Sequence, residues 1–167
     1  MTIKQRDVIA SENYVYPLNA PLSVEDMSQR VERLGKKLHA IRFSKELDPK
    51  KVLHVLVKDN IGVEDFFTSA GSKALEALRL PDAFCIRKLK VAGVDVFGKT
   101  HMTELAGFLS TAGLSGAYSE LGGFGVNPYG SEYPSGGSSS GSCISVAAGL
   151  CDAALGTETR GSLMIPD

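Results

Sequence analysis

The chain of 167 residues has 18 basic and 19 acidic residues, with 43% hydrophobic and 22% charged residues, a balance typical of an ordinary globular protein. This near-neutral charge favours neither a nucleic-acid partner nor a membrane partner, and the length is sufficient for one domain with its own core. The start of the chain lacks an apolar leader, and no later stretch has the apolar run that a membrane span needs, so we expect a cytoplasmic protein.

Residues 1–20 are polar and irregular, which predicts an N-terminal arm, and residues 21–167 are expected to form the domain. From Ser23 onward, apolar residues recur at helical spacing with charged residues between them, and Ser23 is placed to cap the start. We therefore expect an amphipathic helix that packs on a core rather than on a membrane. Its apolar positions are Met27, Val31, Leu34, Leu38 and Ile41.

The middle of the chain predicts alternating strands and helices. A continuous apolar run at 52–57 predicts a strand buried on both faces, with Lys58 at its end. A helix is expected over 81–92, closed by Gly93, and a short strand over 94–97. This alternation implies an α/β sheet.

The remaining elements are less regular. Residues 100–109 are predicted to be helical, whereas residues 110–137 have no periodicity and are expected to form a long irregular connection. Such connections in compact domains are usually functional or disordered, and this one leads into a cluster of glycine and serine. Residues 142–150 then predict a helix of small residues packed closely on the sheet, and residues 155–157 lead to a second serine.

One stretch imitates a nucleotide-binding motif. Residues 93–100 match the phosphate-loop pattern G-x-x-x-x-G-K-[ST] letter for letter. A phosphate loop needs a strand before its first glycine and a loop after it. Here residues 84–92 are helix-like and the residues after Gly93 form the predicted strand, so nucleotide binding is disfavoured.

The cysteines and histidines show no metal-binding pattern. The cysteines are odd in number and lack C-x-x-C spacing, so we expect buried thiols rather than disulfides or zinc ligands. The histidines are equally scattered, whereas metal ligands need convergent geometry. No metal and no cofactor are therefore expected. These residues are Cys85, Cys143, Cys151, His39, His54 and His101.

Glycine and serine are concentrated at residues 135–142, and a second Gly-Ser step, Gly161-Ser162, comes later in the chain. With Lys58 upstream, these are the components of a serine nucleophile activated without histidine. In a plainer interpretation, the run is a flexible linker and the lysine a solvated strand end. A linker would not lead into the apolar small-residue helix expected at 142–150, which favours the catalytic interpretation.

Six stretches of the chain, in this order, match the motifs of one family: Leu56–Ile61, Thr68–Ser72, Gly98–Met102, Asn127–Pro128, Gly136–Ser142 and Gly156–Ser162. By these motifs the C-terminal two thirds resembles the amidase signature family of serine hydrolases. The 24 residues that separate Ser138 from Ser162 also match the family spacing. The resemblance implies an α/β fold with a mixed central sheet flanked by helices, of which this chain would hold the N-terminal portion, ending before the sheet is complete.

The resemblance also implies residue roles. Ser162 is the expected nucleophile, Ser138 relays its proton through a hydroxyl held by a cis backbone, and Lys58 is the base. The oxyanion hole would consist of the backbone amides of Thr159, Arg160, Gly161 and Ser162. The implied activity is hydrolysis of the C–N bond of a small linear carboxamide, with no cofactor.

The residue types agree with these roles. Glycine beside Ser162 lets backbone amides approach a substrate carbonyl without interference from a Cβ atom. A lysine acts as a base only when neutral, so Lys58 must be desolvated and its pKa lowered. Hydrolysis should then rise with pH until Lys58 has lost its proton.

Several positions depart from the family pattern. Arg160 stands where many members have glycine, Met164 where many have arginine, and His101 where asparagine is common. These differences are expected to change specificity or local packing, and the Arg160 side chain could crowd the site or bind an acidic substrate group.

The chain also ends at Asp167, soon after Ser162, whereas family domains continue far beyond that point. An incomplete sheet exposes a strand edge and an apolar face. We therefore expect one piece of a split or longer enzyme, completed by a complementary chain or by self-association. The alternative is a non-catalytic, amidase-like binding protein.

Overall fold

The computed structural model describes residues 22–107 and 117–166, so the predicted arm at 1–20 lies outside the described residues. A four-stranded sheet in the order β1-β3-β2-β6 forms the centre. β2 runs parallel to β3 and β6, whereas β1 is antiparallel to β3. The sheet is therefore mixed, as predicted. Its strands are β1 (Ile41–Ser44), β2 (His54–Lys58), β3 (Asp95–Thr100) and β6 (Ala153–Leu155).

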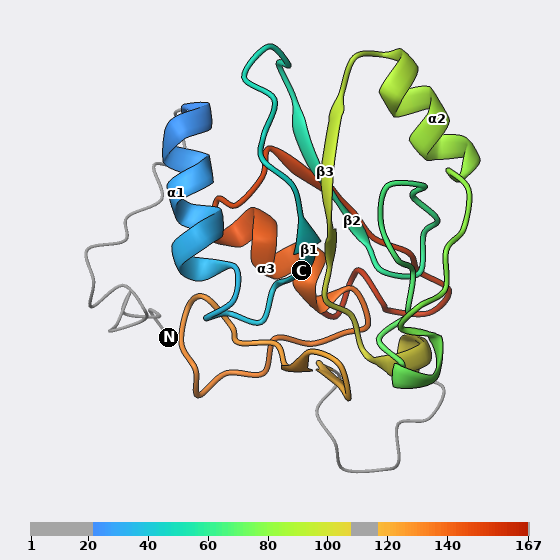
Figure 1. Cartoon of the computed structure of the whole chain (residues 1–167). Coiled ribbons are helices and arrows are strands. Elements are labelled where there is room, and N and C mark those ends of the chain that lie inside the picture. The colour runs from blue at the N-terminus through green and yellow to red at the C-terminus, as the bar shows by residue number, and fades with distance from the viewer. Residues whose placement is uncertain (1–21, 108–116, 167) are drawn as a thin grey trace.

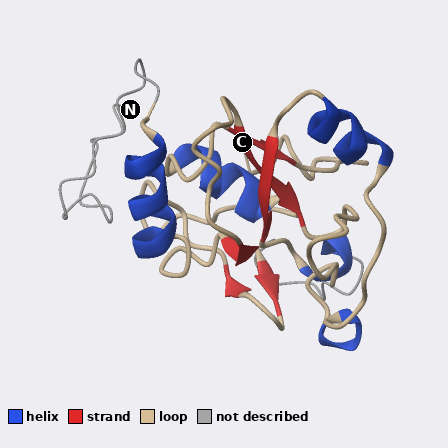
Figure 2. Ribbon diagram, turned by 45° about the horizontal axis from the view of Figure 1, so that its top comes forward, coloured by secondary structure: helices blue, strands red, loops and turns tan. Residues whose placement is uncertain are grey.

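Three α-helices of the described residues flank this sheet, which confirms the α/β class. α1 and α3 lie on one side of it and α2 on the other (Figure 1 and Figure 2). The helices are α1 (Val24–Leu34), α2 (Phe84–Val91) and α3 (Ser140–Ala147).

Helix α1 begins as predicted but ends early. Its N-cap, Ser23, accepts a hydrogen bond from the Asp26 amide at 3.1 Å. The helix ends at Leu34, so its predicted extension to Ile41 was wrong. Leu38 is nevertheless buried, and Ile41 begins β1. The helical spacing misled because the turn and the strand after α1 direct their apolar residues into the same core.

Strand β2 begins two residues later than the sequence pattern indicated and ends one residue later. Val52 and Leu53, predicted to be buried, are 90% and 48% exposed. All five residues of β2 are buried, because the strand is paired on both edges and covered on both faces. Lys58 is the last residue of β2, at the strand end where it was expected.

Strand β3 is longer than predicted and accounts for the phosphate-loop pattern. α2 ends before Gly93, whose φ of +83° suits a residue without Cβ. The strand then continues through Gly98, Lys99 and Thr100, and all six of its residues are buried. The lysine of the pattern therefore lies inside a central strand and not in a loop, which argues against a phosphate site here.

The predicted helix over 100–109 was wrong within the described residues. Thr100 ends β3, and the next element is a short 3-10 segment, η3 (Glu104–Gly107). Leu105 and Ala106 have φ values of 46° and 57°, which are incompatible with a right-handed helix. Residues 108 and 109 lie outside the described residues.

The connection expected to be irregular contains two short strands. β4 (Tyr118–Ser119) and β5 (Gly123–Phe124) form an antiparallel pair. Another 3-10 segment, η2 (Lys73–Leu75), lies between β2 and α2. α3 comes after the connection as predicted but begins two residues earlier, at Ser140.

The core has one apolar cluster on each side of the sheet. Leu56 and Phe97 contribute to the cluster beneath α1 and α3, whereas Val57 and Val96 contribute to the cluster beneath α2. This alternation follows from the two-residue period of a strand. Because Lys58 is two residues after Leu56, its side chain lies on the α3 side.

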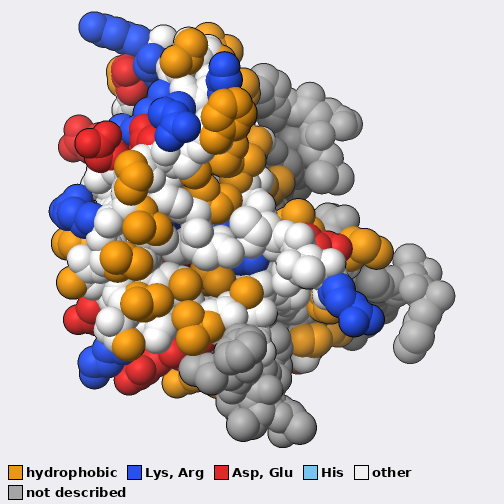
Figure 3. All heavy atoms as spheres, turned by 90° about the vertical axis from the view of Figure 1, so that its right-hand side faces the viewer, with side chains coloured by type: hydrophobic (Ala, Val, Ile, Leu, Met, Phe, Trp, Pro, Cys, Tyr) orange, Lys and Arg blue, Asp and Glu red, His pale blue; other side chains and the backbone are white. Residues whose placement is uncertain are grey.

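Hydrophobic side chains also remain exposed. Several gather on the α2 side of the molecule (Figure 3), where Leu78, Phe84 and Val91 are exposed. A second exposed group comes directly after Ser162 and consists of Leu163, Met164 and Ile165.

Candidate active site

Lys58 is the innermost residue of the predicted site. Its side chain is 0% exposed. Its ammonium donates hydrogen bonds to Ser138 Oγ at 2.8 Å, to Ser139 Oγ at 2.8 Å and to the carbonyl oxygen of Thr157 at 3.0 Å. A lysine ammonium has three protons to donate, so these three acceptors satisfy it completely.

Burial also changes the acidity of Lys58. Desolvation lowers its pKa from 10.5 to about 8, and the nearby Cys143 and Glu158 groups oppose this change because negative charge favours the ammonium. A surface lysine is almost entirely charged at neutral pH, whereas this one has an appreciable neutral fraction.

The two predicted serines are connected to Lys58 in series. Ser138 Oγ donates to Ser162 Oγ at 2.9 Å and accepts from Lys58. The Gly137–Ser138 peptide bond is cis. Gly136 precedes it with a φ of +64°, and a Cβ atom there would come within 2.8 Å of the Pro166 backbone. The glycines of this run therefore allow the two serine segments to approach each other.

Ser139 also belongs to this cluster, and the sequence reasoning missed it. Its hydroxyl accepts from Lys58, donates to the Thr157 carbonyl at 3.2 Å and accepts from the Thr157 amide at 3.3 Å. Its backbone amide donates to the carbonyl of Ser162 at 3.0 Å. Ser139 thus contacts both Lys58 and Ser162. Adjacent serines could have signalled this role, because a run of three offers more than one hydroxyl to a buried lysine.

The segment from Thr157 to Ser162 forms an exposed turn that is held by Glu158. The Glu158 carboxylate accepts from the Leu163 amide at 2.6 Å and from the Met164 amide at 3.0 Å. Hydrogen bonds from the amides of Met164, Leu163 and Gly161 lower the pKa of this carboxyl group. The sequence reasoning did not identify Glu158 as a residue that holds the turn.

The predicted oxyanion residues all lie on this turn. Gly161 has a φ of +95°, in the region that favours glycine. Among residues 22–107 and 117–166, the amides of Thr159, Arg160 and Ser162 donate no hydrogen bond. The Gly161 amide, in contrast, is hydrogen-bonded to the Glu158 carboxylate.

The three residues that depart from the family pattern have different surroundings. Arg160 is exposed on this turn, and Met164 is exposed directly after it. His101 is buried, with its Nε2 at 2.7 Å from the Ala117 carbonyl, and desolvation lowers its pKa.

The thiols differ from their prediction. Cys151 is buried, and burial raises its pKa to about 12. Cys143 is half-buried and Cys85 is exposed, so the expectation of three buried thiols was wrong for these two.

In the described part of the chain, no group of three or more His, Cys, Asp or Glu residues could hold a metal ion. No helix there is long and apolar enough to cross a membrane.

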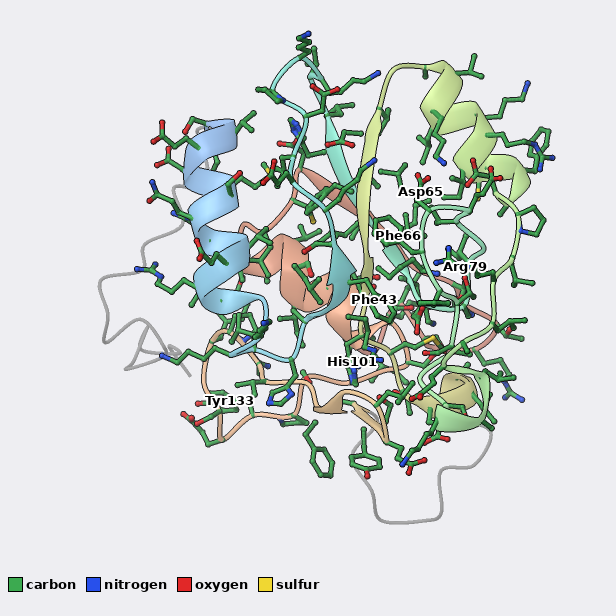
Figure 4. The ribbon with its side chains drawn as sticks, in the orientation of Figure 1. Phe43, Asp65, Phe66, Arg79, His101 and Tyr133 are labelled. Carbon is green, nitrogen blue, oxygen red and sulfur yellow. The ribbon has the colours of Figure 1, made fainter. Side chains whose placement is uncertain are left out.

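Several hollows lie near the sheet, and two of them bear on the search for the site. A groove of about 1,070 Å³ runs between α1, β1 and the 65–67 segment, and Phe43, Asp65, Phe66 and Arg79 line it (Figure 4). It contains none of the predicted catalytic residues. A smaller hollow of about 400 Å³ lies beside α3, and its lining includes Cys143 and Leu163, which neighbour the Lys58 and Ser162 cluster.

Comparison with known proteins identifies the family of the chain. The model of the Amidase family matches residues 20–166, so the chain belongs to the Amidase family. The A subunit of the mitochondrial glutamyl-tRNA(Gln) amidotransferase of Tuber melanosporum is 33% identical over 99% of this chain. The A subunit of the glutamyl-tRNA(Gln) amidotransferase of Solidesulfovibrio magneticus is 46% identical over 67% of it.

Solved structures give the same result. The native peptide amidase of Stenotrophomonas maltophilia superposes with a TM-score of 0.77 over 87% of this chain, at 35% identity. An amidase family protein of Bacillus anthracis superposes with a TM-score of 0.77 over 95%, at 28% identity. This chain covers 35% and 38% of those two structures, and 34% of the Tuber protein. It therefore spans about a third of the length of its relatives.

Proposed function

We propose that this chain carries the catalytic serine site of an amidase and hydrolyses the C–N bond of linear carboxamides. Ser162 is the nucleophile, Ser138 the proton relay and Lys58 the base. The observation that carries the proposal is the uninterrupted hydrogen-bonded series from Lys58 Nζ through Ser138 Oγ to Ser162 Oγ, with steps of 2.8 and 2.9 Å.

With Lys58 charged, the hydrogen bonds run from Lys58 through Ser138 to Ser162. Once Lys58 is neutral, the two hydroxyls can turn so that Ser162 donates to Ser138 and Ser138 donates to Lys58. Ser162 Oγ attacks the carbonyl carbon of the amide while its proton passes to Ser138 Oγ, whose own proton passes to neutral Lys58. The carbonyl oxygen becomes an oxyanion, which the backbone amides of Thr159, Arg160 and Ser162 stabilise, whereas the Gly161 amide is engaged by Glu158. Lys58 then returns its proton through Ser138 to the departing amine. Water then attacks the acyl-enzyme and gives its proton to Lys58 through Ser138. Ser162 regains a proton by the same path, and the carboxylic acid is released.

The environment of Lys58 suits a base at neutral to mildly alkaline pH. With a pKa of about 8, about a tenth of Lys58 is neutral at pH 7, because each pH unit below the pKa reduces that fraction about tenfold. The three acceptors around Nζ hold the ammonium that forms after proton transfer. No cofactor is needed for any of these steps.

We also propose that further polypeptide completes the site, either later in the same chain, in a complementary chain or in a second copy. The chain spans about a third of its relatives' length, and β6 is an edge strand of its sheet. Leu163, Met164 and Ile165 are exposed immediately after Ser162. Polypeptide that covers them would also shape the pocket for the acyl group. A cytoplasmic location remains a prediction.

The test is release of ammonia from a set of primary carboxamides, compared between the protein and single-site variants. Ser162→Ala and Ser138→Ala should abolish turnover. Ser135→Ala is the matched control, because Ser135 belongs to the same Gly-Ser run but bonds to the Gly125 carbonyl. Turnover that survives Ser162→Ala would contradict the proposal, and absence of turnover by an assembled protein would favour a non-catalytic binding role.

A further inference from the structure

A buried ion pair between Asp59 and Lys99 lies next to Lys58 in the fold, because Asp59 directly follows Lys58 in the chain. Lys99 Nζ is 3.3 Å from Asp59 Oδ1, and both side chains are 0% exposed. Burying a charge is costly unless it is paired and hydrogen-bonded. Neither residue takes part in the proton path described above, so the pair requires a different explanation.

The Lys99 ammonium holds the segment after β2. It donates to the Ile61 carbonyl at 2.8 Å, to Thr68 Oγ1 at 2.9 Å and to the Phe67 carbonyl at 3.4 Å. Lys99 itself is fixed within β3, beside Val57 of β2. A single cation thus connects β3 to two parts of the 59–70 segment.

Asp59 fixes the same segment from its other end. Its carboxylate accepts hydrogen bonds from the amide of Ser69 at 3.3 Å and from the Ser69 hydroxyl. Its backbone carbonyl accepts from the Ala70 amide at 3.1 Å. The turn after Lys58 is therefore held by the ion pair and by these hydrogen bonds.

This turn supports both the base and one of its acceptors. The Ile61 amide donates to the Lys58 carbonyl at 3.0 Å. Asn60 Nδ2 donates to Thr157 Oγ1 at 2.9 Å, and the Thr157 carbonyl accepts from Lys58 Nζ at 3.0 Å. A displacement of the turn would therefore move Lys58 and Thr157 together.

We propose that the buried Asp59–Lys99 pair is a positioning device for the amidase site, which fixes the turn at 59–61 and so keeps Lys58 and Thr157 in register with Ser138. The inference rests on the proposed function, because it assigns the pair a purpose only if Lys58 is the base. It also explains the phosphate-loop pattern, since the lysine of that pattern is the buried cation.

The test measures the pKa of Lys58 by NMR titration of the protein labelled with ¹³C at lysine Cε. The Lys58 signal is assigned by its loss in Lys58→Arg. The titratable groups that face Lys58 are Cys143 from α3 and Glu158 from the turn after β6, and neither is altered in the test variant or in its control.

The double variant Asp59→Asn/Lys99→Met removes both charges, so that neither is left buried alone. Release of the turn should admit water to Lys58 and raise its pKa from about 8 toward its ordinary value, by about one unit or more. Asp95→Asn is the matched control, because Asp95 is a buried carboxylate at the opposite end of β3 that accepts from the Asp48 amide. It should lower the melting temperature and leave the Lys58 pKa unchanged.

A folded double variant with an unchanged Lys58 pKa would overturn the inference. If the double variant does not fold, amide hydrogen exchange on the unaltered protein tests whether the pair holds the turn at 59–61. The Ile61 and Ala70 amides should be protected as strongly as those of β2, and rapid exchange through local opening would refute positioning by the pair. Neither measurement needs a reactive Ser162, so failure of the proposed function and failure of this inference can be told apart.

Discussion

Burial of Lys58 predicts a specific pH dependence for the reactivity of Ser162. A decrease in the Lys58 pKa from 10.5 to about 8 means that about 300 times more of this lysine is neutral at pH 7. Because only neutral Lys58 accepts a proton, the rate of Ser162 modification should follow its neutral fraction. That fraction rises about fifty-fold from pH 6 to pH 8, but only about twofold above pH 8.

The assay is the rate of Ser162 modification by a fluorophosphonate probe, followed by intact mass spectrometry from pH 6 to pH 10. Lys58→Met should be slow at every pH, because the relay then has no base. A rate that does not depend on pH, or a midpoint that Lys58→Met leaves in place, would refute the reasoning.

Three further predictions concern neighbouring residues. Ser139→Ala removes one acceptor from Lys58, and loss of a hydrogen bond to a charged group should slow Ser162 labelling at pH 9 by about tenfold or more; an unchanged rate would mean that Ser139 does not hold the base. Glu158→Gln should move the midpoint of the labelling profile below pH 8, because the Glu158 carboxylate favours the charged form of Lys58 and its removal lowers that pKa; a midpoint that moves upward would contradict this sign. Leu56→Ala, at a 0% exposed position of β2, should decrease the free energy of unfolding in urea by about 2–5 kcal/mol, whereas Val52→Ala, at a 90% exposed position, should change it by less than about 0.5 kcal/mol.

The sequence predicted the sheet better than its connections. The apolar run before Lys58 predicted a strand buried on both faces. The prediction succeeded because a strand covered on both faces needs apolar residues at successive positions, and all five residues of β2 are buried. Local spacing could not show that α1 ends at Leu34, because Leu38 continues the helical period from a turn. Nor could it show the left-handed backbone at Leu105 and Ala106, which no residue type at those positions signals.

The candidate site was predicted through its motifs. Lys58, Ser138 and Ser162 were named from the sequence, and the structure brings their side chains into one hydrogen-bonded series. Ser139 was missed because the run of adjacent serines does not say which hydroxyl reaches Lys58 and Thr157, and only the fold decides that. The pairing of Asp59 with Lys99 was missed for the same reason, because the two residues lie 40 positions apart.

The central claim is that Ser162 is an activated nucleophile, and native mass spectrometry of the protein before and after treatment with a fluorophosphonate tests it most directly. The spectrum reports the assembly state and the covalent adduct together. The account predicts a single adduct that is absent in Ser162→Ala and present in Ser135→Ala. An adduct that persists in Ser162→Ala, or no adduct on a folded protein with all its partners bound, would contradict it.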